Sequence, residues 1–142
     1  MRNFVLITNI YKDRELRLSH RIVSYIQDRG GRAEICVSNI EGVMQKDFEL
    51  SEIPEDTECI IVLGGDGTLI RAATKVESLH IPLIGVNLGT LGYLCELEET
   101  SVFEAVDRLM ADNYMIEERL MLSGSKTCLL YTSPSPRDYA AS

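Results

Sequence analysis

The sequence is poor in the side chains that build metal sites and disulfides. It has four cysteines and two histidines in 142 residues. The cysteines are Cys36, Cys59, Cys95 and Cys128. They lie far apart and form no C-x-x-C pair, which argues against a zinc site or a disulfide framework and favours buried reduced thiols in a cytoplasmic protein. His20 and His80 are isolated, so surface or packing roles are expected for them rather than catalysis.

Basic clusters and long apolar runs are also missing. The formal net charge is −8, and no group of Lys and Arg offsets it. This argues against a nucleic acid or an anionic membrane as partner. No apolar run approaches transmembrane length, and residues 1–15 become charged too early for a secretion signal. A phosphate-bearing ligand would therefore be held locally, by backbone dipoles, a few basic residues and a metal ion.

Alternating strand and helix patterns predict an α/β fold. The 142 residues, 45% of them hydrophobic, suit one domain with a core. Short β-branched runs predict strands, and apolar residues at three- and four-residue spacings predict helices. The strands are expected at residues 3–8, 32–37, 60–63 and 81–87, and the helices at 14–29, 68–75 and 98–112. A polar, acidic excursion over 39–58 is expected to be a solvated surface without a site role.

One stretch joins a buried strand to a glycine turn and a helix. It reads Ile60-Ile61-Val62-Leu63-Gly64-Gly65-Asp66-Gly67-Thr68, and Thr68 is expected to cap the helix that follows. At such a turn the unpaired backbone N–H groups and the positive helix end bind phosphate. An anion would not favour a carboxylate as neighbour, so Asp66 is expected to take a proton or to meet a cation. The alternative is that Gly64, Gly65 and Gly67 are needed for steric reasons only.

A second glycine-containing segment follows the next strand. It reads Asn87-Leu88-Gly89-Thr90-Leu91-Gly92-Tyr93-Leu94. Because ligands of open α/β sheets lie outside the carboxyl ends of the strands, this segment and the glycine turn are expected to form opposite walls of one crevice. Tyr93 offers a ring on which a flat base could lie. The alternative is that Tyr93 only covers the core.

The glycine turn fits neither the G-x-G-x-x-G dinucleotide fingerprint nor a P-loop. Gly64-Gly65-Asp66-Gly67-Thr68 instead resembles the signature of the NAD kinase and diacylglycerol kinase-like superfamily. The later run from Gly85 to Leu94 separates the branches, because lipid kinases carry a Gly-Thr-x-Asn-Asp type segment in that region. From Arg2 to about Leu122 the chain therefore resembles the N-terminal domain of an NAD kinase. Residues 117–122 are similar to the family's passage into a second, all-β domain.

The resemblance implies a fold and an activity. The fold is a Rossmann-like, open, mostly parallel sheet with helices on both faces; the family's second β-sandwich domain is missing from this chain. The activity is phosphoryl transfer from ATP, or from polyphosphate in some members, to the 2′-hydroxyl of the adenosine ribose of NAD, which gives NADP. NAD and ATP are the implied substrates and Mg²⁺ or another divalent cation the cofactor. A homo-oligomer is implied for the full-length protein, with low activity for this chain alone.

Individual residues match positions of the family motifs. The resemblance makes Asp66 the proposed general base and Gly67 the adjacent backbone contact to the dinucleotide. Arg71 falls at a position that often touches the nucleotide, and Tyr93 matches the aromatic position beside the adenosine. Ile70 is a lesser candidate for the apolar wall beside the adenosine. A carboxylate within hydrogen-bond reach of a ribose hydroxyl can orient it and accept its proton.

The last twenty residues do not resemble the family. After Ser123-Gly124-Ser125-Lys126 the chain reads Thr127-Cys128-Leu129-Leu130-Tyr131-Thr132-Ser133-Pro134-Ser135-Pro136-Arg137-Asp138. This run resembles the in-frame translation of a transposase adapter used in sequencing libraries. Residues 123–142 are therefore expected to be a non-native or disordered tail and are excluded from the fold prediction. A native Ser/Pro-rich linker is the alternative, and its composition would also predict disorder.

Two other functions remain open from the sequence. A stand-alone nucleotide-binding module would bind NAD or ATP tightly without turnover. A lipid kinase of the same superfamily would phosphorylate a diacylglycerol instead.

Overall fold

A single mixed sheet organises the chain. The computed structural model describes residues 1–39, 46–89, 94–118 and 129–132. The strands lie in the order β2-β1-β3-β4-β7-β6, and β5 also pairs with β4. They are β1 (Asn3–Asn9), β2 (Arg32–Ser38), β3 (Cys59–Gly64), β4 (Leu83–Asn87), β5 (Leu97–Glu98), β6 (Met115–Glu118) and β7 (Leu129–Thr132). The first five pair in parallel, whereas β7 runs antiparallel to β4. The predicted open, mostly parallel sheet is confirmed.

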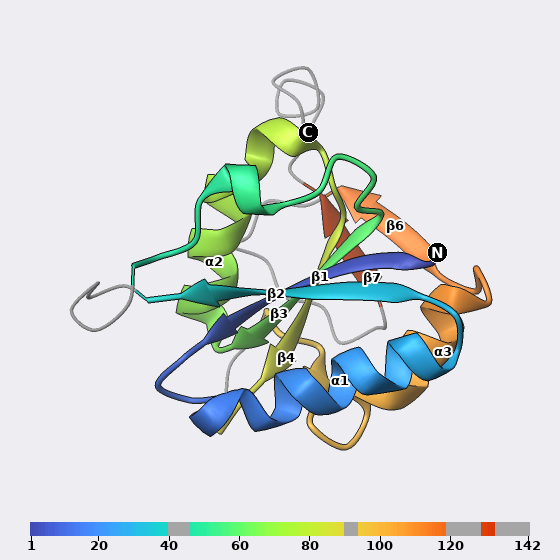
Figure 1. The fold of residues 1–142 in the computed structure, drawn as a ribbon. Coiled ribbons are helices and arrows are strands. Elements are labelled where there is room, and N and C mark those ends of the chain that lie inside the picture. The colour runs from blue at the N-terminus through green and yellow to red at the C-terminus, as the bar shows by residue number, and fades with distance from the viewer. Residues whose placement is uncertain (40–45, 90–93, 119–128, 133–142) are drawn as a thin grey trace.

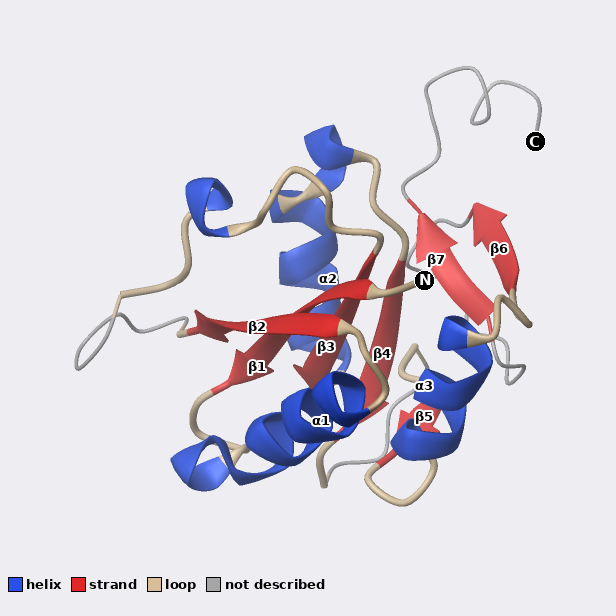
Figure 2. Ribbon diagram, turned by 45° about the vertical axis from the view of Figure 1, so that its right-hand side comes forward, coloured by secondary structure: helices blue, strands red, loops and turns tan. Residues whose placement is uncertain are grey.

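Helices cover both faces of this sheet. α1 (Arg17–Asp28) and α3 (Val102–Met110) pack on one face, and α2 (Asp66–Lys75) packs on the other (Figure 1, Figure 2). Short 3-10 turns at Arg14–Leu16, Leu50–Glu52 and Glu77–Leu79 complete the helical elements of the described residues. The arrangement with helices on both faces is the one that the sequence predicts.

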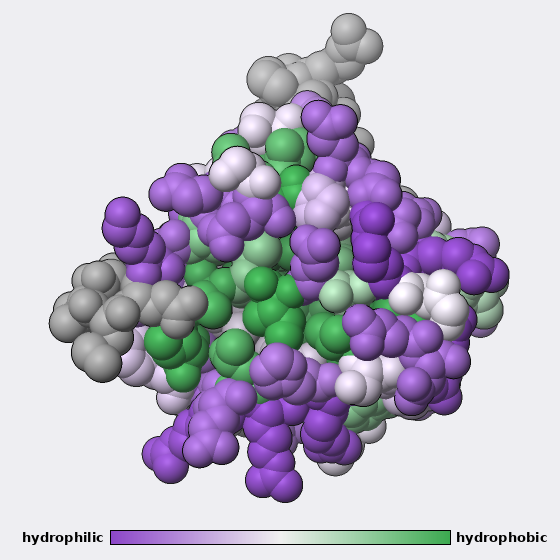
Figure 3. All heavy atoms as spheres, in the orientation of Figure 1, coloured by the Kyte–Doolittle hydropathy of each residue, from purple (hydrophilic) through white to green (hydrophobic). Residues whose placement is uncertain are grey.

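The central strand β3 is buried along its whole length. Ile61 and Leu63 contribute to the core under α1 and α3, and Ile60 and Val62 to the core under α2. Each such side chain contributes about 1.5–3 kcal/mol by leaving water. This two-sided burial explains why the strand is a continuous apolar run rather than an alternating one. In Figure 3 the apolar residues gather near the centre of the visible face, and hydrophilic residues surround them.

The helix predicted at residues 14–29 starts later than expected. Residues 14–16 form a 3-10 turn that contains two residues with φ of 56° and 55°. The cause is the buried carboxylate of Asp13, which accepts hydrogen bonds from Leu18 N (2.9 Å) and Ser19 N (3.2 Å). It thereby provides acceptors for first-turn N–H groups that have no partner within a helix. The same carboxylate accepts from the hydroxyl of Thr8 at 2.9 Å.

The helix predicted at residues 98–112 is shorter at both ends. Glu98 belongs instead to β5, where its backbone pairs with Asn87 of β4. Glu98 N also donates to Ser101 Oγ at 2.9 Å, so the chain turns before α3 begins. Asp112, with φ of 58°, lies beyond the helix end. A two-residue strand carries too little pattern to be recognised in the sequence.

Two other predictions concern membrane-spanning helices and the last twenty residues of the chain. None of the helices in the described parts is long and apolar enough to cross a membrane. Strand β7 falls within residues 123–142, where Leu129 to Thr132 pair with β6. The prediction that residues 123–142 are non-native stays a prediction. So does the proposed boundary near residue 122, which lies outside the described residues.

Candidate active site

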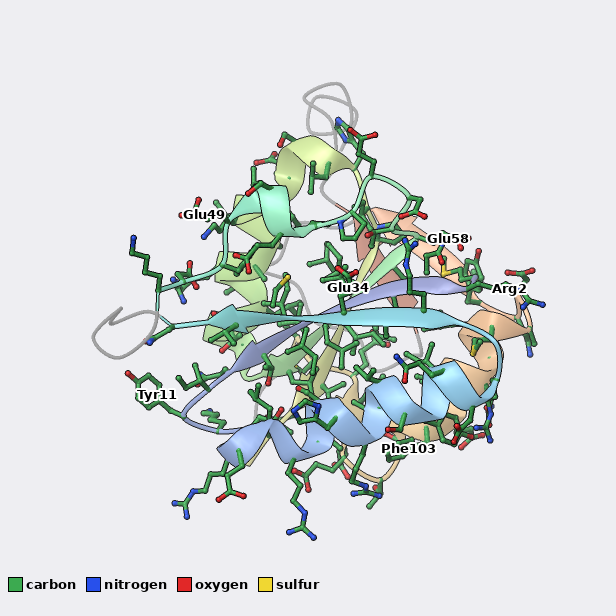
Figure 4. All side chains as sticks on the ribbon, viewed as in Figure 1. Arg2, Tyr11, Glu34, Glu49, Glu58 and Phe103 are labelled. Atoms are coloured by element: carbon green, nitrogen blue, oxygen red, sulfur yellow. The ribbon has the colours of Figure 1, made fainter. Side chains whose placement is uncertain are left out.

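The predicted site residues that the structure describes gather at the carboxyl edge of the parallel strands. Asn9, Gly64 and Asn87 are the last residues of β1, β3 and β4. Gly64 pairs with Asn87 in the strand register, and Thr8 pairs with Leu63. Tyr11 marks this edge in Figure 4, at the opposite end of β1 from Arg2. This edge is where an open α/β sheet binds its ligands.

The glycine turn begins with a close contact at Gly64. A β-carbon built on Gly64 would lie 2.5 Å from Thr68 Oγ1, so no larger residue fits without a shift. The sequence predicts that Thr68 caps α2, and this prediction is wrong. Gly65 is the N-cap, with an extended backbone (φ −129°, ψ −167°), and the helix begins at Asp66. The hydroxyl of Thr68 instead accepts a hydrogen bond from Asn9 Nδ2 at 3.3 Å. The steric explanation therefore accounts for Gly64.

Gly67 has no such steric explanation. It lies in the first turn of α2, it is exposed, and a β-carbon built on it would meet nothing within 4 Å. Its φ is not positive, so the backbone accepts other residues. An open glycine beside first-turn N–H groups leaves room for a ligand to approach the backbone. Gly64 is thus required by packing against Thr68, whereas Gly67 leaves the backbone open to a ligand.

Asp66 connects the glycine turn to the second predicted segment. Its Oδ1 accepts a hydrogen bond from Leu94 N at 3.0 Å. At the other end of that segment, Leu88 N donates to Gly64 O at 2.7 Å. The carboxylate is half-buried and its orientation is fixed by the backbone of residue 94. The two segments, distant in sequence, therefore lie in contact, whereas Tyr93 itself lies outside the described residues.

Lys12 is a site neighbour that the sequence motifs do not indicate. Its Nζ would lie 3.3 Å from a β-carbon built on Gly65. The pKa of the Cys95 thiol also reports on the surroundings: burial and the charge of Asp66 raise it, Lys12 lowers it, and together they bring it to about 12. Lys12 lies in the turn after β1, at the carboxyl end of the strand beside β3. That position was the available signal, but it required the strand order to be known.

Ile70 and Arg71 share an exposed stripe of α2 with Gly67. Residues three and four apart lie on one helix face, and Ile70 is 38% exposed. Arg71 extends toward the carboxyl end of β2, where Nη1 donates to Ser38 Oγ at 3.3 Å. The structure thus places three of the predicted nucleotide-binding residues along one stripe that leads away from Asp66.

Asp47 holds Arg71 in this position. Its Oδ2 lies 3.5 Å from Arg71 Nη2 and 2.8 Å from Lys75 Nζ. Burial would raise the pKa of this carboxyl, but the hydrogen bonds from Lys75 and from the Asn39 backbone outweigh it, and the pKa lies below its usual value. The sequence predicts that the acidic residues of 39–58 form a solvated surface without a site role. For Asp47, which is half-buried and pairs with Arg71 and Lys75, that prediction is wrong.

The described residues contain no group of three or more His, Cys, Asp or Glu side chains that could hold a metal ion. Cys36, Cys59 and Cys95 are free thiols, and Cys128 lies outside the described part of the chain. His20 and His80 are exposed; His20 lies on α1 and His80 follows the 3-10 turn at Glu77–Leu79.

The chain is similar in sequence to known kinases. A family model described as the ATP-NAD kinase N-terminal domain matches residues 4–114. An NAD kinase of Agathobacter rectalis is 62% identical over 126 residues, which cover 89% of this chain and 44% of that protein. An NAD kinase of Lachnospira eligens is 39% identical over 127 residues, covering 87% and 43%. The chain therefore spans less than half the length of these curated relatives.

Among solved structures, yeast NADH kinase complexed with NADH aligns with 80% of this chain and 39% of its own. The sequence identity is 14% and the TM-score is 0.45.

Proposed function

Given that this chain belongs to the ATP-NAD kinase family, we propose that the full-length protein containing it is a phosphotransferase that converts NAD to NADP. The acceptor is the 2′-hydroxyl of the adenosine ribose, and the donor is ATP or polyphosphate. The observation that supports this best is the hydrogen bond between Asp66 Oδ1 and Leu94 N. It brings the only carboxylate of the glycine turn against the second motif and gives it a fixed direction.

Asp66 is the proposed general base. A ribose hydroxyl is a poor nucleophile, and a carboxylate within hydrogen-bond reach can accept its proton as the oxygen attacks the terminal phosphorus of the donor. The new O–P bond forms while the bond to the leaving ADP, or to the shortened polyphosphate, breaks. The hydrogen bond from Leu94 N holds the carboxylate in one orientation for this proton transfer.

The donor phosphates are proposed to lie at the N-terminus of α2. First-turn N–H groups and the positive helix end attract anions there, and Gly65 and Gly67 let them approach. The donor would enter as its complex with Mg²⁺, since Mg²⁺ is commonly held by one or two carboxylates together with substrate phosphates. The glycine turn has one carboxylate, Asp66, and the described residues hold no group of three or more metal-ligating side chains, so the metal would be held mainly by the donor phosphates.

The remaining predicted residues are assigned to the nucleotide. We propose that Gly67 contacts the dinucleotide through its backbone, that Ile70 and Tyr93 contribute an apolar wall for the adenosine, and that Arg71 contacts the nucleotide. Arg71 would keep its orientation through Asp47. The protein is proposed to act in the cytoplasm, as a homo-oligomer when full length, without nucleic-acid or membrane partners.

The experiment compares Asp66→Asn with wild type in the full-length protein, with NADP formation as the readout. Loss of a general base is expected to lower kcat by about 10²–10⁴-fold. Calorimetric titration with NAD should show binding within a few-fold of wild type, because the amide keeps the size of the carboxylate. Asp28→Asn, an exposed carboxylate at the end of α1, is the matched control and should leave kcat unchanged.

Three results would contradict the proposal. Full activity in Asp66→Asn would remove the base from its role. Tight binding of NAD by wild type without any turnover would instead support a binding module, and phosphorylation of a diacylglycerol would support a lipid kinase.

A further inference from the structure

Asn87 carries an unsatisfied polar atom beside the proposed active site. Among the described residues, its Oδ1 is the one buried side-chain oxygen or nitrogen without a hydrogen-bond partner. A buried polar atom left unpaired destabilises a protein, and nearly all such atoms are paired in native structures. The exception therefore needs an explanation in terms of what the residue does.

The side chain of Asn87 faces α2. Side chains alternate along a strand, and Leu83 of β4 belongs to the core under α2, whereas Ile84 and Val86 belong to the opposite core. Asn87 is thus on the Leu83 side. Gly85 lies between them on the same side, and a β-carbon built on it would meet Leu69 of α2 at 3.1 Å. Asn87 extends one step further along the strand, toward the N-terminal end of α2 and Asp66.

Asn9 provides a direct comparison on the same edge of the sheet. Asn9 and Asn87 end the two strands that flank β3. Both polar atoms of the Asn9 amide have partners: Nδ2 donates to Thr68 Oγ1 at 3.3 Å, and Oδ1 accepts from Tyr11 N at 2.9 Å. The amide of Asn87 has no such pairing for its oxygen. Asn9 therefore has a structural role that Asn87 lacks.

We propose that Asn87 is a nucleotide-binding residue whose amide oxygen accepts a hydrogen bond from the 3′-hydroxyl of the adenosine ribose. This inference rests on the proposed function, in which Asp66 takes the adjacent 2′-hydroxyl. A vicinal diol presents two donors side by side, and the neighbouring ends of β3 and β4 present a carboxylate and an amide. The half-buried Asn87 side chain rotates on binding, so that Oδ1 exchanges a buried, unpaired position for a hydrogen bond.

The proposal predicts opposite effects on the melting temperature when Asn87 and Asn9 are each replaced by leucine. Asn87→Leu replaces the amide with an apolar side chain of similar size and removes an unpaired atom, so the free protein should melt at or above the wild-type temperature. Asn9→Leu removes two hydrogen bonds and should melt below it. A merely structural Asn87 would behave like Asn9.

The functional test uses the full-length protein with NAD and with its analogue that lacks the 3′-hydroxyl of the adenosine ribose. The analogue keeps the reacting 2′-hydroxyl. Wild type should prefer NAD in kcat/KM by about tenfold, the effect of one hydrogen bond together with the release of a buried polar atom. Asn87→Leu should lose about tenfold with NAD and treat the two substrates alike. Asn9→Leu should retain the wild-type preference.

The outcomes separate this inference from the proposed function. A wild-type protein that makes no NADP overturns both. A wild-type protein that makes NADP but accepts the analogue equally well overturns only the role of Asn87, whatever the variants do. The same holds if Asn87→Leu keeps the preference for NAD, or if it melts as low as Asn9→Leu or fails to fold.

Discussion

Replacing Gly67 with alanine separates ligand binding from stability at the glycine turn. Gly67 lies in the first turn of α2 with no positive φ, and an added β-carbon would meet no atom within 4 Å. Alanine should therefore stabilise the helix by up to about 1 kcal/mol, since glycine loses more backbone entropy on folding. For a domain of this size that corresponds to a rise in Tm of about 3–5 °C. The measurement is thermal unfolding followed by circular dichroism.

The same substitution should impair the enzyme. If NAD approaches the backbone at Gly67, a methyl group there separates the nucleotide from its contacts, and we expect kcat/KM for NAD in the full-length protein to fall at least about tenfold, equivalent to about 1.4 kcal/mol. Gly64→Ala is the comparison, because its β-carbon would lie 2.5 Å from Thr68 Oγ1. Overpacking there should lower the free energy of unfolding by about 1–3 kcal/mol. A Gly67→Ala protein that is stabilised and fully active would refute the proposed close approach.

The remaining predictions concern stability and thiol chemistry. Asp13→Asn places an amide N–H₂ against several donors, among them Thr8 Oγ1, Leu18 N and Ser19 N. It should lower the free energy of unfolding by about 3 kcal/mol in urea titration, and an unchanged midpoint would contradict the role of this carboxylate. Burial raises the pKa of Cys36 to about 11 and that of Cys95 to about 12, so both thiols should resist iodoacetamide at pH 8 in the folded protein. Since unfolded thiols lose their protons near pH 8.5, the folded state binds more protons above that pH, and stability should fall as pH rises from about 9 toward 12. Rapid alkylation of Cys95 at pH 8 would contradict its burial.

The sequence predicts the sheet better than the ends of its helices. β1, β2 and β3 match the predicted strands closely because β-branched runs bounded by glycine and charged residues leave little choice. The start of α1 could not be predicted, because it depends on Asp13 reaching two N–H groups further along the chain. The start of α2 was misplaced for a related reason. Thr68 looks like a cap, but its hydroxyl is used by Asn9, a residue of another strand.

In the candidate site, too, the sequence predicts some features and not others. The glycine turn and the segment after β4 are recognisable as motifs, and the open-sheet rule predicts that they meet. Their contact through Asp66 and Leu94 follows that rule. Lys12, Asp47 and Asn87 were missed as site residues, because each matters through a neighbour that is distant in sequence. The unpaired oxygen of Asn87 exists only in three dimensions and has no signature in the chain.

The segment from Leu88 to Leu94 is tied down at both ends, by Gly64 O at the first residue and by the Asp66 carboxylate at the last. Connecting segments usually tolerate changes in length, but here an inserted or deleted residue would displace the Leu94 N–H group that orients the carboxylate of Asp66, the proposed base. Evolution and protein engineering should therefore find this stretch rigid in length even where its side chains vary. In a library of single-residue insertions, we expect insertions in this segment to abolish activity and insertions in the turn between α1 and β2 to preserve it.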